Sequence, residues 1–141
     1  MAKNEQGRAL GSVAAGHPDT AAAAHAILLE GGNAIDAAIA AILVSTIAEG
    51  PLTGLGGGGY ATVRDTNGEV YSVDFFVDTP GLGLELTTER RTRGFHGVDI
   101  DFGSTNQVFH VGGGSIAVPG LPLGVEHLSK RFGTLPMSRL V

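Results

Sequence analysis

The sequence predicts a mixed α/β (α+β) fold. Two neighbouring stretches, 20–30 and 34–49, are rich in alanine, isoleucine and leucine, and their apolar residues follow helical spacing. Two stretches with alternating side chains, 60–65 and 69–76, come next and flank an Asn-Gly pair, a strong short signal for a β-hairpin. The chain therefore combines helices with strands, and each element is taken in turn below.

The composition limits both the core and the classes of partner. Of 141 residues, 43% are hydrophobic and 16% charged, so the chain can bury the core of one modest domain and is unlike a disordered segment. With no Trp and only 6% aromatic residues, the core must rely on Ala, Val, Ile and Leu. A net charge of -5 with nine Lys or Arg residues disfavours a nucleic-acid partner, which needs a basic face. The absence of cysteine excludes disulfides, thiolate metal sites and cysteine nucleophiles.

Targeting signals are not visible in the sequence. The first ten residues, MAKNEQGRAL, lack the apolar segment of a signal peptide, so the cytoplasm is the default expectation for a compartment that is otherwise unknown. The longest apolar run, AIDAAIAAILVSTIA, is interrupted by Asp36 and is too short to span a bilayer. No membrane partner is therefore expected.

The first helix has clear boundary signals. A short strand is expected over 11–18, ending at a proline, and Asp19 or Thr20 could cap the helix that follows over 20–30. The pair Gly31-Gly32 is a suitable stop. We therefore expect a helix of about three turns, followed at once by the next helix.

The second helix, 34–49, is expected to begin at Asn33 as its cap. Apolar residues surround almost its whole circumference, which predicts full burial. Its many alanines would let another element pack very close. This helix is thus the predicted centre of the core.

The C-terminal part predicts two strands and two helices. The stretches 107–111 and 115–118 look like strands around three glycines, and a helix is expected over 122–131 with Gly133 as its stop. Pro136 is expected in the first turn of a further helix. The helix within 119–133 is amphipathic, which favours a surface helix packed on the sheet over a membrane helix.

The stretch 77–106 shows no clear period, and we expect a long irregular loop there. Three arginines, Arg90, Arg91 and Arg93, cluster inside it. One small basic cluster on an acidic chain is more typical of a solvated loop than of a nucleic-acid site.

A glycine-rich stretch, GLGGGGY, joins the second helix to the first strand. Gly54, Gly56 and Gly59 satisfy the G-x-G-x-x-G dinucleotide fingerprint, but that motif needs a strand before the glycines and a helix after them, and here the order is inverted. No P-loop Lys-Ser/Thr pair follows either. We therefore expect no nucleotide cofactor, and instead a glycine corner with room for another backbone or a ligand.

Two separated blocks carry a family resemblance. The first block reads AAGHPDTAAAAHAILLEGGNAIDAAIAAILVSTIAEGPLTGLGGGGYATV. It resembles the start of the large chain of the gamma-glutamyltranspeptidase family, with its G-H-P turn, G-G-N-A helix end, A-x-D-A-A helix start and G-x-G-G-G-G corner. SIAVPGLPLGVEHLSKRFGTLPMSRLV is similar to the family's later V-P-G and F-G-x-L-P segment. The resemblance implies that residues 1–141 are an incomplete N-terminal segment of such a large chain.

The resemblance also implies a fold and a reaction. Family members are N-terminal-nucleophile hydrolases, αββα four-layer sandwiches made as one chain that cleaves itself. A threonine exposed at the start of the small chain then attacks a gamma-glutamyl amide, and backbone N–H groups stabilise the oxyanion. The expected function is transfer or hydrolysis of a gamma-glutamyl or related acyl amide. The expected partners are the small chain of the same precursor and the amide substrate.

No catalytic residue is expected within this chain, and the chain alone is predicted to be inactive. Thr46, Thr53, Thr79 and Thr105 are expected in strands, caps or turns. The fragment alone should expose an apolar sheet face and associate, for instance as a homo-oligomer. The alternative, from another functional class, is a non-catalytic α/β binding or interaction module that retains the family scaffold.

One substrate-binding position departs from the family. An arginine in the family's D-F-R-E-x-A-P stretch grips the substrate α-carboxylate, a role suited to its bidentate geometry. The corresponding stretch here is DFFVDTP, which places Phe76 at the arginine position and Val77 at the glutamate. Since phenylalanine cannot hold a carboxylate, we expect poor handling of simple gamma-glutamyl anilides. An acylase-like or amidase-like substrate, or a replacement arginine from 90–93, is the expected compensation.

Three other clusters are weak candidates. His17, Asp19 and His25 lack metal-ligand spacing, so no metal is expected and His17 should make a turn hydrogen bond. Asp99 and Asp101 lack the other acidic positions of a calcium loop and suit a turn.

Asp74 and Asp78 could form a carboxylate pair for acid–base work. The alternative is that Asp74 ends its strand and binds backbone donors.

Overall fold

The computed structural model consists of two units. It describes residues 2–3, 9–81, 83–85, 87–89 and 94–141. The first unit is Met1–Val77 with Pro119–Val141, and the second is Asp78–Val118. The arginine cluster at 90–93 lies outside the described residues.

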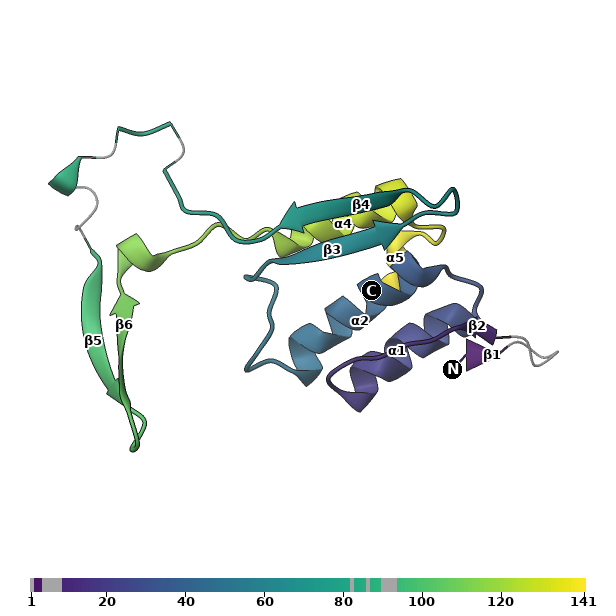
Figure 1. The fold of residues 1–141 in the computed structure, drawn as a ribbon, viewed down its shortest axis with the longest axis horizontal. Coiled ribbons are helices and arrows are strands. Elements are labelled where there is room, and N and C mark those ends of the chain that lie inside the picture. Colours follow the sequence, from purple (N-terminus) through teal and green to yellow (C-terminus); the bar gives the residue numbers. More distant parts are fainter. Residues whose placement is uncertain (1, 4–8, 82, 86, 90–93) are drawn as a thin grey trace. The chain divides into compact units, whose positions relative to one another are not determined.

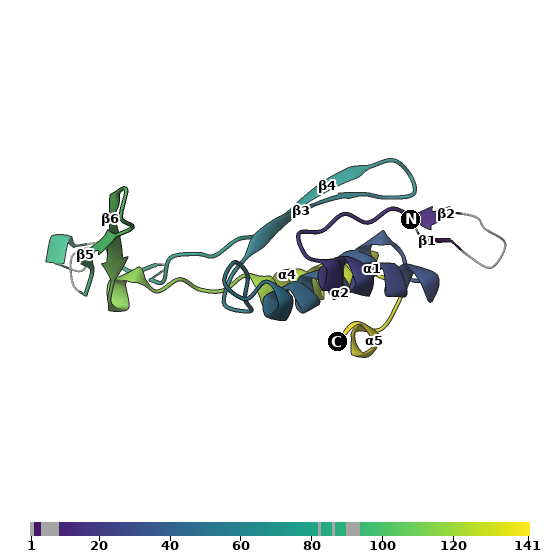
Figure 2. The ribbon, with the colours of Figure 1, turned by 90° about the horizontal axis from the view of Figure 1, so that it is seen from below.

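The first unit holds the helices and two short antiparallel strand pairs, β1–β2 and β3–β4. Its elements are β1 (Ala2–Lys3), β2 (Ala9–Gly11), α1 (Pro18–Leu29), α2 (Ala34–Ala48), β3 (Gly59–Arg64), β4 (Val70–Phe75), α4 (Leu121–Phe132) and α5 (Met137–Leu140). Figures 1 and 2 show α1 and α2 side by side and the β3–β4 hairpin as a separate layer over the helices. The predicted mixed α/β fold is confirmed.

Helix α1 begins earlier than the sequence predicted. His17, rather than Asp19 or Thr20, is the N-cap, because its Nδ1 accepts a 3.2 Å hydrogen bond from the Asp19 N–H and Pro18 suits the first turn. The strand expected over 11–18 is wrong beyond Gly11, since β2 ends there. The helix ends where expected: Gly31 has a φ of 93°, a conformation that favours glycine.

Helix α2 starts at the predicted cap. The Asn33 side chain accepts hydrogen bonds from the N–H groups of Ile35 and Asp36, and Asp36 accepts one from the Asn33 N–H, which completes a capping box. The predicted full burial is wrong: Ile39 is buried, but Ile47 is 86% exposed. Ala34, Ala38 and Ile47 are the exposed positions of this helix, and its other side chains are buried or half-buried.

The predicted hairpin is confirmed. Strands β3 and β4 pair antiparallel, with Tyr60 opposite Asp74 and Val63 opposite Tyr71. Gly68 has a φ of 88° in the connecting turn, where one Asp65 oxygen accepts two backbone N–H groups at 2.8 and 2.9 Å. Because side chains alternate along a strand, one face of the hairpin is buried against the helices and the other is exposed.

The core is aliphatic, as the composition predicted. Ile39 is fully buried at its centre, and Phe75 is its one aromatic member. The buried hydrophobic residues are Ala24, Ile27, Leu28, Ala37, Ile39, Ala40, Val63, Phe75, Leu121, Val125, Leu128 and Leu140. They come from α1, α2, the hairpin, α4 and α5, so one core joins segments from both ends of the chain.

The C-terminal helices follow the prediction closely. Helix α4 buries Leu121, Gly124, Val125 and Leu128 and exposes its other side, as expected for an amphipathic surface helix. Gly133 ends it. Pro136 lies one residue before α5, as its N-cap, rather than inside the first turn. No helix among the described residues is long and apolar enough to cross a bilayer.

Two predictions for the second unit are wrong. The stretch 77–106 is not irregular throughout, because its last part forms β5 (His96–Asp101), paired antiparallel with β6 (Asn106–Val111). The predicted strand over 115–118 is also wrong, since a 3₁₀ turn, η1 (Gly113–Ser115), and one bridge from Val118 to Asp78 are found there. The partner of β6 is thus β5, whose short alternation of apolar and acidic residues is a weak signal.

Candidate functional site

The glycine corner brings three backbone segments together. The Gly57 carbonyl accepts hydrogen bonds from the N–H groups of Gly120 and Leu121, at 3.2 and 3.1 Å. A Cβ on Gly58 would lie 2.5 Å from the Phe75 carbonyl oxygen and 2.6 Å from the Val77 nitrogen. This close approach confirms that the glycines admit another backbone.

Glycines on the facing segment fix the end of β4 from the other side. A Cβ on Gly120 would overlap the Phe75 and Phe76 carbonyls, and one on Gly124 would overlap the Phe75 side chain. Phe75 therefore packs into the core against α4. Because side chains alternate, Phe76 is directed to the opposite face of the hairpin.

Phe76 stacks on Tyr60 at this exposed face. The ring centroids are 5.4 Å apart and the ring planes differ by 12°. Both rings are well exposed, Tyr60 at 69% and Phe76 at 53%. Sequence reasoning singled out Phe76 but missed Tyr60, which only the strand register brings beside it.

The two candidate carboxylates bind backbone donors of their own segments. Asp74 Oδ1 accepts a 3.0 Å hydrogen bond from the Phe76 N–H, and Asp78 Oδ1 accepts a 2.8 Å bond from the Thr79 N–H. The strand-ending role expected for Asp74 is thereby confirmed. Asp78 belongs to the other unit.

A cavity of about 480 Å³ lies beside the corner, and Tyr60 forms part of its wall. Its lining combines apolar side chains, glycine backbone and four side chains that carry a hydroxyl, with no charged side chain. The lining residues are Ile42, Ser45, Thr46, Gly50, Pro51, Leu52, Thr53, Gly54, Gly57, Gly58, Gly59, Tyr60, Phe75 and Leu121.

The three Ser and Thr hydroxyls of this cavity already have acceptors. Ser45 donates to the Ile42 carbonyl at 2.8 Å, Thr46 to the Leu43 carbonyl at 2.7 Å, and Thr53 to the Ser45 carbonyl at 2.6 Å. Thr46 thus lies within α2 rather than in the strand, cap or turn expected for it, whereas Thr53 follows the turn after this helix. Because each of these three hydroxyls already donates its proton to a carbonyl, it can only accept a hydrogen bond from a ligand.

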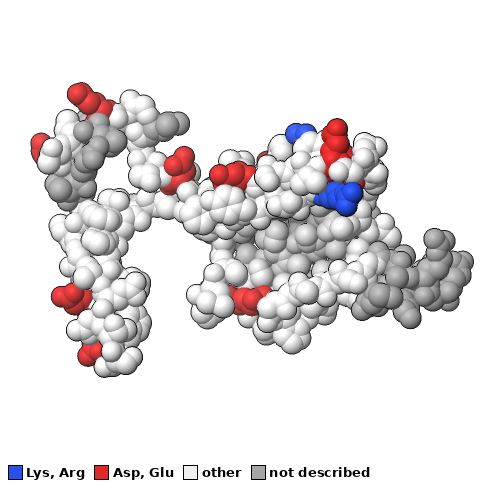
Figure 3. Space-filling view, in the orientation of Figure 1, with Lys and Arg blue, Asp and Glu red and all other residues white. Residues whose placement is uncertain are grey.

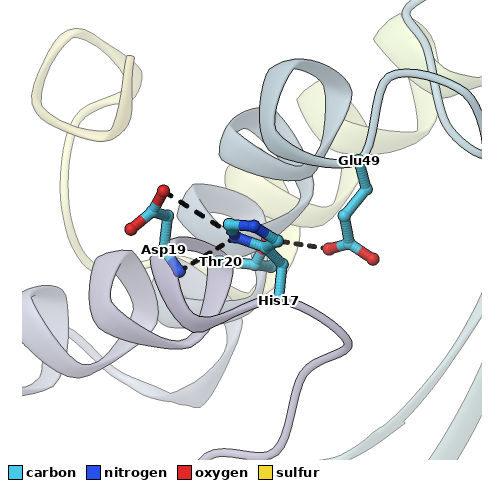
Figure 4. Close-up of polar contacts among 4 residues, drawn as sticks. All are labelled: His17, Asp19, Thr20 and Glu49. Carbon is cyan, nitrogen blue, oxygen red and sulfur yellow. Dashed lines mark hydrogen bonds and ion pairs between the residues drawn. The ribbon is translucent and has the colours of Figure 1, made fainter.

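His17, Asp19, Thr20 and Glu49 meet where α1 begins and α2 ends (Figure 4). The buried Thr20 hydroxyl donates a 2.8 Å hydrogen bond to Glu49 Oε1, and a Cβ on Gly16 would lie 2.7 Å from the other Glu49 oxygen. The hydrogen bond between Thr20 and Glu49 therefore links the start of α1 to the end of α2.

His17 acts as a helix cap, which confirms its expected turn hydrogen bond. Among the side chains that the structure describes, no group of three or more His, Cys, Asp or Glu residues could hold a metal ion. Asp101 accepts a backbone N–H of its turn, that of Gly103, at 2.7 Å.

Asp36 is a second polar centre that sequence reasoning missed, and it is fully buried. Burial alone would raise the pKa of its carboxyl, but hydrogen bonds from the Thr134 hydroxyl and from the N–H groups of Asn33, Thr134 and Leu135 outweigh burial. The pKa of Asp36 therefore lies below its ordinary value, and the side chain is a structural carboxylate.

The fold of this chain is similar to that of solved gamma-glutamyltranspeptidases, which are N-terminal-nucleophile hydrolases. A gamma-glutamyltranspeptidase from Pseudomonas nitroreducens, complexed with L-DON, superposes with a TM-score of 0.71 at 32% identity, over 92% of this chain and 36% of that one. The Helicobacter pylori gamma-glutamyltranspeptidase gives a TM-score of 0.70 at 25% identity, over 94% of this chain and 36% of that one. The fold class expected from the sequence is confirmed.

The sequence model of the gamma-glutamyltranspeptidase family matches residues 20–141, and the chain belongs to this family. It is 35% identical over 140 residues to the acylase ACY 1 proenzyme of Pseudomonas sp. strain SE83, covering 93% of this chain and 23% of that protein. It is 36% identical over 115 residues to glutathione hydrolase proenzyme 1 of Schizosaccharomyces pombe, covering 81% and 16%. The chain thus spans less than a quarter of the length of these relatives.

Proposed function

We propose that this chain is the N-terminal part of the large chain of a self-cleaving amide hydrolase or acyl transferase. The match to two proenzymes over most of the chain supports the proposal. The nucleophile is a threonine at the start of a small chain outside this sequence. Its hydroxyl oxygen forms an ester with the acyl carbon as the amide C–N bond breaks and the hydroxyl proton passes to the leaving amine. Water or an amine acceptor then releases the acyl group.

In this proposal the chain contributes one wall of the acyl-binding site and has no activity alone. The observation that carries it is the position of Phe76, which follows the last residue of β4 and projects from the exposed face of the hairpin. Phe76 stands where the family's carboxylate-binding arginine is expected. Loss of one buried bidentate contact costs roughly 2–5 kcal/mol, so gamma-glutamyl substrates are disfavoured. The name of the acylase relative supports an amide of another acid.

The small chain of the same precursor is the proposed partner. Apolar side chains exposed around the end of α2, namely Ile47, Leu52 and Leu55, support an extensive contact surface there. Removal of such a surface from water would stabilise the joined chains.

Intact-mass spectrometry of the full-length protein under denaturing conditions tests this proposal. We expect two chains, the second beginning with threonine, and one uncut chain when that threonine is changed to alanine. A single uncut chain from the wild-type sequence would contradict the proposal. It would favour the alternative, a non-catalytic module that retains the scaffold.

A further inference from the structure

The stacked pair of Tyr60 and Phe76 is an exposed aromatic surface, and Tyr60, though not Phe76, also lines the cavity beside the corner. Tyr60 lies opposite Asp74 in the strand register, and Phe76 is two residues beyond Asp74, so both rings project from the same face. The next residue inward, Phe75, faces the core and is buried. Contiguous exposed aromatic side chains at a cavity are typical of binding sites.

The backbone that carries Phe76 is held on two sides. Gly58 and Gly120 each approach it too closely to accept a side chain, and the Asp74 carboxylate accepts the Phe76 N–H. The backbone around Phe76 is therefore already held in place without a ligand. A surface fixed in advance loses little conformational entropy on binding.

The charge around the pair is negative. Asp74 is exposed beside the two rings, and none of the ion pairs found within the described residues involves it. Figure 3 shows acidic side chains where β4 finishes, whereas the Lys and Arg side chains lie farther along the hairpin and α4. Among the described residues, a ligand carboxylate placed on the rings would therefore meet repulsion from Asp74 rather than a cation.

The neighbouring cavity wall offers no charge either. Apart from Tyr60, its described side chains are apolar or carry hydroxyls that donate to backbone carbonyls. A carboxylate entering this cavity would lose its hydration without a charged partner among the described side chains, which is costly. A neutral, flat group would instead gain contact with the rings and the glycine backbone.

We propose that Tyr60 and Phe76 determine specificity for an uncharged aromatic acyl group in the amide substrate. This inference rests on the proposed function, because it assigns the acyl class to that same site. The two rings bind the acyl group and orient it, and the bond-breaking groups are those of the small chain. In this proposal, Phe76 cannot bind a substrate carboxylate, but it binds an aromatic ring of the substrate instead.

The test uses full-length, self-cleaved enzyme and two chromogenic substrates, phenylacetyl p-nitroanilide and gamma-glutamyl p-nitroanilide. The wild-type enzyme should show a kcat/KM about tenfold or more higher for the phenylacetyl compound. Phe76→Arg should move the ratio of the two kcat/KM values by about 100-fold toward gamma-glutamyl. Tyr60→Ala should lower kcat/KM for the phenylacetyl compound by about tenfold, chiefly through KM.

Phe102→Arg is the matched control, because Phe102 is 56% exposed, close to the value for Phe76, and lies in the other unit. This control should leave the ratio unchanged. A cleaved wild-type enzyme that prefers the gamma-glutamyl compound overturns the inference, together with the expected loss of gamma-glutamyl binding. It leaves standing the proposal of a self-cleaving amide hydrolase or acyl transferase. Absence of self-cleavage in the wild type overturns both. The wild-type preference decides the matter even if a variant fails to fold.

Discussion

The Thr134 hydroxyl donates a 2.6 Å hydrogen bond to the Asp36 carboxylate, joining residues that are 98 positions apart in the sequence. The same carboxylate accepts the N–H groups of Thr134 and Leu135, at 3.1 and 3.3 Å. Asn33 adds a 2.6 Å bond from its amide to the Phe132 carbonyl. The start of α2 is therefore tied to the turn between α4 and α5 through one buried acid.

Replacement of this acid should destabilise the protein strongly. In Asp36→Asn, an amide NH₂ would replace one of the two carboxylate oxygens. It would then face either the Asn33 N–H or the N–H groups of Thr134 and Leu135, so a buried donor would lose its acceptor. We expect a loss of about 2–3 kcal/mol in the free energy of unfolding. Urea unfolding of the full-length protein measures it. Asp101→Asn, at an exposed turn, is the control and should change stability by less than about 0.5 kcal/mol.

The contribution of Asp36 should depend on pH. Its pKa in the folded protein is lowered from the ordinary value of 3.8, so the folded state favours the charged form. The resulting stabilisation is fully present above about pH 5 and is lost as the pH falls from about 4 through the lower folded pKa. We expect the stability difference between wild type and Asp36→Asn to be flat from pH 5 to 7 and to shrink toward pH 2. A difference that grows on acidification would contradict the lowered pKa.

The glycines of the corner should differ sharply in their tolerance of alanine. A Cβ on Gly58 meets backbone atoms of Phe75 and Val77, whereas Gly56 has nothing within 4 Å. Gly58→Ala should therefore cost about 1–3 kcal/mol and reduce the yield of cleaved enzyme, and Gly56→Ala should be nearly neutral. Thermal unfolding of the two variants side by side measures the contrast. Equal melting temperatures would show that the close approach is relieved by a small backbone shift.

The hydrogen bond between Thr20 and Glu49 should couple the two helices energetically. Thr20→Val keeps the side-chain shape but removes the donor, and Glu49→Ala removes the acceptor. We expect a coupling energy of about 1–2 kcal/mol from a double-mutant cycle on urea unfolding. Pairing Thr20→Val with Glu126→Ala, on α4, serves as the control cycle and should be additive. Additivity in both cycles would mean that the bond contributes nothing beyond local packing.

Local signals made much of the fold predictable. Helices α1, α2 and α4 and the β3–β4 hairpin each have boundary residues, such as Asn33 and Gly68, whose effect is confined to a few neighbours. The aliphatic core followed from composition alone. The reading of the glycine corner also rested on local order, since a helix before the glycines excludes the dinucleotide motif.

Long-range relationships were not predictable. The pairing of β5 with β6 depends on which of several weak strand signals meet, and the strand expected from the sequence over 115–118 was wrong. The bonds from Thr20 to Glu49 and from Thr134 to Asp36 join residues distant in the chain, and no local pattern marks them. Tyr60 reaches Phe76 only because the hairpin register aligns them. Such contacts depend on how separate elements pack.

The bridge between Asp78 and Val118 has a consequence for how this protein can change over time. Two backbone hydrogen bonds, at 3.1 and 2.7 Å, hold these residues together, and all of the second unit lies between them. A chain segment whose two ends are paired with each other can be lengthened, shortened or exchanged without moving the residues at its ends. In evolution, the stretch from 78 to 118 is therefore free to diverge in length and composition among descendants while the helices and the hairpin stay the same.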